Sequence, residues 1–330
     1  MSAWSVSALA AALVGLGGIG APLAAQHPVE GTEWMIFNLR AHSQPVIPIF
    51  DGWYEKADGT RDLCFGYFSL NTEQTVEIPV GPENFITPAR FDGAQPTHFM
   101  PVPRPPHTYR RYFCTFVVNL PPEWGPEEPV TWTLRVNGKD YSVPGYYKSI
   151  NYRIDEIAKV ATGQGGRGIA PWIRFEPSGP EGVGRSGVWG NPQRVAVGQP
   201  LQLALAVTQP DSELVAEIRA KSGITAASGG GGGDSVDDDG DPRPGGRRGQ
   251  ERQRDWWVIW TKHQGPGDVA FSAQSQDVFP GESTVSTTAT FSAPGEYVLR
   301  VQAIDDPGEG GSYQFHCCWT NGYVRVTVTR

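Results

Sequence analysis

Three stretches in the last third of the chain alternate apolar and polar residues, at 285–291, 297–303 and 324–328. A period of two is typical of half-buried strands, because successive side chains of a strand point to opposite faces. Pro294-Gly295 separates the first two stretches and predicts a tight turn between them. The pattern therefore predicts antiparallel strands of a β-sandwich.

The first half of the chain has a similar pattern of short apolar runs, at 46–50, 63–70, 112–120 and 130–136. Dipeptides that favour turns occur between or beside these runs: Asp51-Gly52, Asp58-Gly59 and Asn137-Gly138. We therefore expect a first β-sandwich at residues 30–155. The predicted fold class is all-β, with two sandwich domains.

Two irregular segments set the remaining boundaries. Residues 156–190 are rich in glycine and proline and predict an ordered connector. The second sandwich is then expected at 191–330, with its opening strands at 193–207. Residues 221–254 combine a glycine run, an acidic run and several arginines, a composition that cannot bury enough apolar area to offset chain entropy. They predict a long disordered loop insertion in the second sandwich.

The second sandwich resembles a known module. Trp260, the GPG at Gly265–Gly267 and the stretch TTATFSAPGEYVLRV are similar to the bacterial PKD/immunoglobulin-like family. Tyr297 precedes Leu299 by two residues, which is the spacing of the tyrosine corner of immunoglobulin folds. The W-D-F-G-D-G signature of PKD repeats is absent. The resemblance implies a spacer or binding module and brings no catalytic residues.

The first domain is similar to the N-terminal part of a group of exported bacterial proteins. The resemblance rests on FDGWYEKADGTRDLCFGYFSLN, IPVGPENFITP and TWTLRVNGK. It implies export and no particular activity.

Composition and the N-terminus narrow the function classes. The net charge of −8 argues against nucleic-acid binding, because no basic surface is expected to neutralise phosphates. Residues 1–25 resemble a signal peptide, with an apolar stretch and small residues before a cleavage point. No later apolar run is long enough to span a membrane. We expect a secreted, periplasmic or cell-envelope protein with no membrane span after cleavage.

Four cysteines in an exported protein are disulfide candidates. Cys64 and Cys114 lie in two aromatic-rich predicted strands, and a bond between them would close a loop of about 50 residues worth roughly 4 kcal/mol. The alternative is a pair of buried thiols. Cys317 and Cys318 are adjacent, which leaves three alternatives: a vicinal disulfide, separately buried thiols, or a soft-metal site with His316.

Other ligand sites have weaker support. Acidic residues in the insertion suggest calcium, but their spacing does not fit an EF-hand, and a solvated linker is the alternative. The acidic loop 305–309 predicts a solvated turn, with calcium as the alternative. We expect no cofactor, with calcium or a soft metal as the alternative. Trp257 and Trp319 are candidate binding residues, since an outward-facing aromatic side chain can stack on a sugar or anchor a protein. The alternative is that neighbouring chain covers them.

The sequence contains no nucleophile elbow, zinc-protease motif or phosphate-binding loop. It therefore favours an exported, non-catalytic protein that binds protein or carbohydrate through its β-sandwich surfaces or acts as a scaffold. One alternative is a polysaccharide hydrolase with an immunoglobulin-like accessory domain, since paired carboxylates can lie far apart in a sequence. The other is a metal or redox role at His316, Cys317 and Cys318.

Overall fold

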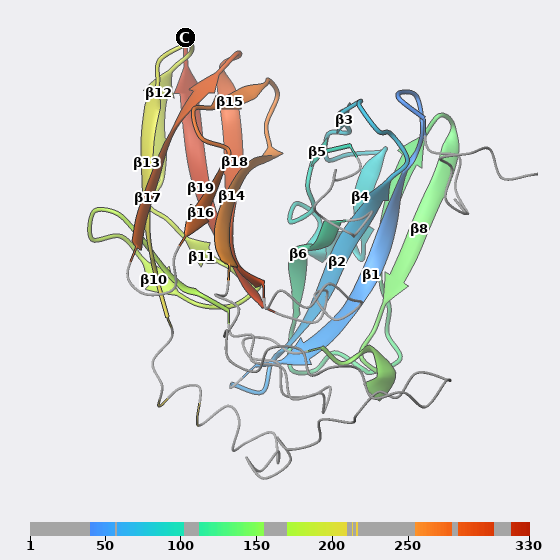
Figure 1. The fold of residues 1–330 in the computed structure, drawn as a ribbon. Helices are drawn as coiled ribbons and strands as arrows, with labels where there is room; N and C mark the ends of the chain where they lie inside the picture. The colour runs from blue at the N-terminus through green and yellow to red at the C-terminus, as the bar shows by residue number, and fades with distance from the viewer. Residues whose placement is uncertain are drawn as a thin grey trace, which may run out of the picture. The chain divides into compact units, whose positions relative to one another are not determined.

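A computed structural model gives the fold, and both sandwiches lie in one compact unit, Leu39–Arg330. The structure describes residues 40–56, 58–101, 112–154, 170–209, 213, 216, 255–278, 283–306 and 318–330. The predicted signal peptide and the predicted insertion 221–254 lie outside the described residues. Among those it describes, no helix has the length and apolar character needed to cross a bilayer. The described elements confirm the all-β fold class (Figure 1).

The first sandwich is assembled from short sheets. Its strands are β1 (Val46–Glu55), β2 (Arg61–Ser69), β3 (Val76–Glu77), β4 (Asn84–Thr87), β5 (His98–Phe99), β6 (Tyr112–Leu120), β7 (Val130–Val136) and β8 (Lys139–Gly145). The strand orders are β1-β2-β6, β4-β7-β8 and β3-β5. Two single-turn 3₁₀ helices complete it, η1 (Ala89–Phe91) and η2 (Ile150–Tyr152).

Aromatic side chains from both larger sheets fill the core of the first sandwich. Trp132 of β7 is fully buried, with its ring centroid 5.0 Å from that of Phe116 and 6.4 Å from that of Phe65. Its indole N–H donates to Asn84 Oδ1 at 3.0 Å. The apolar runs at 63–70, 112–120 and 130–136 therefore correspond to β2, β6 and β7, and most of their side chains are buried.

The hairpin prediction at Asn137-Gly138 is confirmed: both residues have positive φ, 52° and 73°, and connect β7 to β8. The turn prediction at Asp51-Gly52 is wrong. These residues lie inside β1, where the register against β2 shifts between Phe50 and Gly52. Gly52 has φ 138°, and a Cβ there would lie 2.4 Å from the carbonyl oxygen of Tyr152. This dipeptide therefore makes a bulge that admits a close backbone approach.

The second sandwich has longer strands and larger sheets. Its strands are β9 (Trp172–Phe175), β10 (Glu181–Gly182), β11 (Val188–Trp189), β12 (Gln193–Ala196), β13 (Leu201–Thr208), β14 (Asp255–Gln264), β15 (Val269–Phe271), β16 (Ser275–Val278), β17 (Ser283–Phe291), β18 (Gly295–Asp306) and β19 (Trp319–Thr329). One sheet has the order β10-β9-β13-β17-β15, and the other has β11-β19-β18-β14-β16 with β12 also paired to β19. Strands β9, β10 and β11 come from the glycine- and proline-rich segment 156–190.

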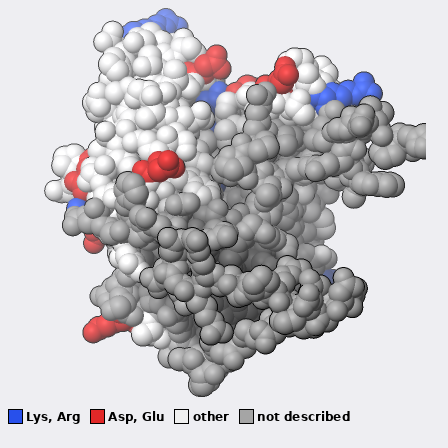
Figure 2. Space-filling view, viewed as in Figure 1, with Lys and Arg blue, Asp and Glu red and all other residues white. Residues whose placement is uncertain are grey.

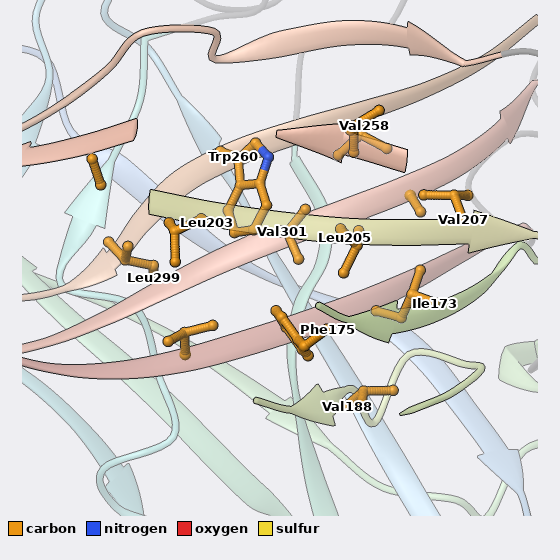
Figure 3. Packing of buried hydrophobic residues seen from close by; sticks show 14 of the residues in the cluster. Ile173, Phe175, Val188, Leu203, Leu205, Val207, Val258, Trp260, Leu299 and Val301 are labelled. Carbon is orange, nitrogen blue, oxygen red and sulfur yellow. The ribbon is translucent and has the colours of Figure 1, made fainter. Parts of the chain in front are cut away.

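The core of this sandwich lies between its two sheets. Figure 3 shows Leu203 and Leu205 of β13 facing Trp260 of β14 and Val301 of β18. At the edge of the core, Tyr297 donates its hydroxyl to Ala293 O at 2.8 Å. This hydrogen bond confirms the tyrosine corner, so the sandwich is immunoglobulin-like. The more specific PKD assignment stays a prediction.

Candidate functional site

The strands β14, β18 and β19 present two different faces. One face carries the apolar residues of the core, and the other carries polar residues that are nevertheless buried: Thr261, His263, Arg300, Asn321 and Tyr323. A polar face is expected to be solvated, so its burial shows that another part of the chain covers it. The first sandwich covers His263 and Tyr323, whereas the segment at Gly184 and Arg185 covers Asn321.

His263 is central to this contact. Its backbone carbonyl accepts from Thr97 N at 2.9 Å, and its Nε2 lies 2.9 Å from Ala94 O. Its ring lies edge-on to Tyr323, with centroids 5.4 Å apart. Burial lowers the pKa of His263 to about 3. The imidazole is therefore neutral at pH 7, and its Nε2–H donates to Ala94.

Other polar side chains join the two sandwiches. Gln264 Nε2 donates to Gly93 O at 2.9 Å and to Gln95 O at 2.7 Å. Tyr323 donates its hydroxyl to Thr115 O at 3.2 Å. Burial raises the pKa of Tyr323, so this hydroxyl stays protonated and keeps its role as a donor.

An ion pair completes the contact. Lys262 Nζ lies 2.9 Å from Glu77 Oε1 and also donates to Gly267 O at 2.7 Å. Glu77 Oε1 lies 2.6 Å from His98 Nδ1 as well. Burial opposes ionisation of Glu77, but the hydrogen bonds from His98 and Lys262 outweigh it and lower its pKa. The carboxylate is therefore charged at neutral pH.

Asp62 of β2 is a second buried charge at the contact, and its side chain is fully enclosed. Its Oδ2 accepts from Ser186 Oγ at 2.6 Å and Tyr54 Oη at 2.9 Å. Its Oδ1 accepts from Asn119 Nδ2 at 2.7 Å and lies 3.7 Å from Lys56 Nζ. Three hydrogen-bond donors and one nearby cation thus compensate this carboxylate, as a buried charge requires.

A cleft of about 560 Å³ opens between the sandwiches, and we call it the interdomain cleft. The first sandwich lines it with Lys56, Asp62, Gly93, Ala94, Phe116, Val117 and Asn119, and the second with Ser186, Trp189, His263, Gln264, Val298, Tyr323 and Arg325. Its size falls within the range of small-molecule sites. Asp62 is the one carboxylate among the described lining residues.

Aromatic and cationic side chains contact one another at the cleft. Trp189 of β11 stacks on Tyr323 with centroids 4.9 Å apart, and the guanidinium of Arg325 lies 4.2 Å from the Trp189 ring centroid. Trp189 keeps 41% of its surface exposed, although it is a large apolar residue. An exposed tryptophan held by two neighbours is a rigid contact surface for a ligand.

The sequence-predicted binding residues lie elsewhere. Trp319 is buried, with the guanidinium of Arg185 4.4 Å from its ring centroid, and Trp257 on β14 is partly buried. Neither lines the interdomain cleft within the described part of the chain. Their role in binding stays a prediction.

The disulfide between Cys64 and Cys114 is confirmed, with Cα atoms 4.9 Å apart. Cys318 is also disulfide-bonded, but Cys317 and His316 lie outside the described residues. The bond excludes a free thiol at Cys318, whereas its partner and the role of His316 lie outside the described residues. The described residues contain no group of three or more His, Cys, Asp or Glu side chains that could hold a metal ion. The acidic residues 234–241 of the suggested calcium site lie outside them.

The cleft residues could be found only in part from the sequence. The alternation in β19 places Arg325 on the face opposite the core, and Trp189 is an isolated aromatic residue in a segment rich in glycine. Nothing in the sequence brings these two residues together with Asp62 and Asn119, which belong to the other sandwich.

The charged residues on the rest of the surface do not suggest a second site on the face that Figure 2 shows. There, the described Lys, Arg, Asp and Glu side chains stand in small separate groups on a largely uncharged surface. A strong field of one sign would need a contiguous patch.

No protein-family model and no curated protein matches the sequence. Among solved structures, the chain is similar to domains 4 and 5 of the S-layer protein SbsC, with 11% identity over 62% of this chain and 66% of that chain and a TM-score of 0.22. It is also similar to the D00-D0 domain of intimin, with 9% identity over 86% of this chain and 100% of that chain and a TM-score of 0.24. Similarity at these TM-scores carries no argument about the role of this chain.

Proposed function

We propose that this protein is a non-catalytic binding protein of the extracytoplasmic space that holds a saccharide in the interdomain cleft. The observation that carries the proposal is the composition of the cleft. It combines the exposed tryptophan Trp189 with the side-chain oxygens of Asn119, Gln264 and Ser186, whose N–H and O–H groups already donate within the protein. Sugar rings offer apolar C–H faces for aromatic side chains and hydroxyl groups for amides and hydroxyls.

The disulfide supports the location. Disulfides persist in oxidising compartments such as the periplasm and the cell exterior. Cys64 and Cys114 are both fully buried, so their bond is part of the folded core. The predicted signal peptide agrees with this location. Cell fractionation of the producing organism tests it, and recovery of the protein in the cytosol with reduced cysteines would contradict it.

Isothermal titration calorimetry of the full chain with a panel of neutral and acidic oligosaccharides tests the function. We expect one or more oligosaccharides to bind, and Trp189→Ala to weaken that binding at least about 10-fold, or about 1.4 kcal/mol. Tyr152→Ala is the matched control, because Tyr152 is also exposed but lies outside the cleft. Equal losses in the two variants, or no binding to the whole panel, would refute the proposal.

A structural role in the cell envelope is the second candidate. The contact between the sandwiches favours it, because the hydrogen bonds of His263, Gln264 and Tyr323 and the Lys262–Glu77 ion pair join them into one unit. A single cooperative unfolding transition at pH 7 would support this candidate. Two separate transitions would count against it.

A further inference from the structure

The net charge of the interdomain cleft is positive, whereas the net charge of the whole protein is negative. The whole protein has a net charge of −8. The cleft is lined by two cations, Lys56 and Arg325, and one carboxylate, Asp62, among the described residues. His263 also lines it but is neutral at pH 7.

The carboxylate of Asp62 balances one of these two cations, which leaves a net charge of +1 on the described lining. Its two oxygens already accept from Tyr54, Ser186 and Asn119, in addition to the contact with Lys56. These contacts fix the carboxylate in the wall of the cleft. Arg325 has no carboxylate at ion-pair distance within the described part of the chain, and its recorded partner is the ring of Trp189.

A third cation lies behind the cleft. Arg300 of β18 pairs with Tyr323 of β19 across the sheet and is buried. Its Nε donates to Asn321 Oδ1 at 3.2 Å, and no described carboxylate forms an ion pair with it. Burial lowers its pKa from the ordinary value, but a guanidinium stays charged in a protein. Its field is weakly screened because the surroundings are not water.

The geometry of Arg325 suits a carboxylate. A guanidinium that stacks on an aromatic ring keeps its N–H edges free, and these edges bind the two oxygens of a carboxylate as parallel hydrogen bonds. Trp189 lies beside this edge with part of its surface exposed. The pair therefore offers an anion site next to an apolar surface, which is the arrangement needed by a sugar ring bearing a carboxylate.

We propose that the interdomain cleft selects acidic saccharides and binds the carboxylate of a uronic acid residue through Arg325 and Lys56. The inference rests on the proposed function and narrows its ligand class. Sugar phosphates share the negative charge and can also bind a guanidinium through two oxygens, so they are the competing ligand class in the test.

The test measures binding of the full chain to oligosaccharides of glucuronate, galacturonate and mannuronate, each beside its carboxyl-reduced counterpart, in which CH₂OH replaces the carboxylate. Sugar phosphates and neutral oligosaccharides complete the set. We expect at least one uronate oligosaccharide to bind at least about 10-fold more tightly than its reduced counterpart.

The variants test which side chains bind the carboxylate. Arg325→Gln and Lys56→Gln should each weaken uronate binding about 5- to 20-fold and change neutral binding less than about 2-fold. Lys139→Gln is the control, because it removes one exposed positive charge far from the lining residues and should leave the affinity unchanged.

The outcomes separate the two proposals. Equal binding of acidic and reduced oligosaccharides would overturn the inference and leave saccharide binding standing. Binding of sugar phosphates alone would also overturn it. Failure of every saccharide would refute both. Equal loss in Arg325→Gln and Lys139→Gln would show a general charge effect and overturn the assignment to the cleft.

Discussion

The sheets of the first sandwich have three, three and two strands, whereas the main sheets of the second have five and six. The cores differ as well. The first is filled largely by aromatic rings, and the second is mostly valine and leucine around Trp256 and Trp260. Short sheets pair less of their backbone, so more polar groups must be satisfied by side chains.

Asn84 shows how the first sandwich does this. Its Nδ2 donates to Ile78 O at 2.9 Å and Pro96 O at 2.8 Å, and its Oδ1 accepts from Trp132. The disulfide adds a covalent link between β2 and β6. In the second sandwich, Leu299 occupies the position where antibody domains have a cysteine, and it is fully buried in the apolar core. We conclude that the first fold depends on specific polar and covalent contacts, and the second on continuous apolar burial.

Matched tryptophan substitutions should give the largest effects. Trp132→Ala and Trp260→Ala should each destabilise by about 3–5 kcal/mol, because both indoles are fully buried. The Phe variants sharpen the comparison. Trp132→Phe leaves Asn84 Oδ1 without its donor and should cost about 1–2 kcal/mol more than Trp260→Phe, since Trp260 Nε1 has no hydrogen-bond partner among the described residues. Urea unfolding measures all four, and equal costs for the two Phe variants would remove the distinction.

Loss of the disulfide should affect the first sandwich most. The double variant Cys64→Ala and Cys114→Ala opens a loop with a sequence separation of 50 residues, which costs about 4 kcal/mol in the chain-entropy model. Hydrogen exchange should show the largest loss of protection in β2 and β6, a smaller loss where Ile304 and Trp319 pack beside the disulfide, and no loss in β13 and β17. Equal loss of protection in both sandwiches would show that they do not differ in this way.

The alternating strands could be predicted from the sequence, because a period of two directly reports one buried face. The tyrosine corner could also be predicted, because it depends on local spacing around Tyr297. The bulge at Asp51-Gly52 could not, since the same dipeptide makes turns and the deciding contact comes from Tyr152, about 100 residues away. The interdomain cleft depends on strands of both sandwiches meeting, which no local pattern encodes.

Acid should weaken the contact between the sandwiches through His263. Its folded pKa of about 3 lies below the ordinary value of 6.5, so the unfolded state binds the proton more tightly. The contribution is complete above pH 6.5 and is lost as the pH falls toward 3, by at most about 1.4 kcal/mol per pH unit. Between pH 6.5 and 4.5 we expect a loss of about 2–3 kcal/mol. His263→Gln should flatten this dependence, and an unchanged pH profile in that variant would assign the acid sensitivity to other groups.

The smallest predicted losses of stability come from removing a tyrosine hydroxyl at either of two positions. Tyr297→Phe removes the hydroxyl that donates to Ala293 O within the second sandwich. Tyr323→Phe removes the hydroxyl that donates to Thr115 O of the first sandwich. Each should cost about 0.5–1.5 kcal/mol, because each leaves one carbonyl without its donor. The two should differ in where the loss appears. Tyr297→Phe should lower hydrogen-exchange protection in β17 and β18 only, whereas Tyr323→Phe should lower it at β6 and β19 together. The contrary outcome is that both variants lower hydrogen-exchange protection in the same strands. The second sandwich and the contact between the sandwiches would then unfold as a single cooperative unit. In that case the first sandwich could not be compared with the second as a separate fold.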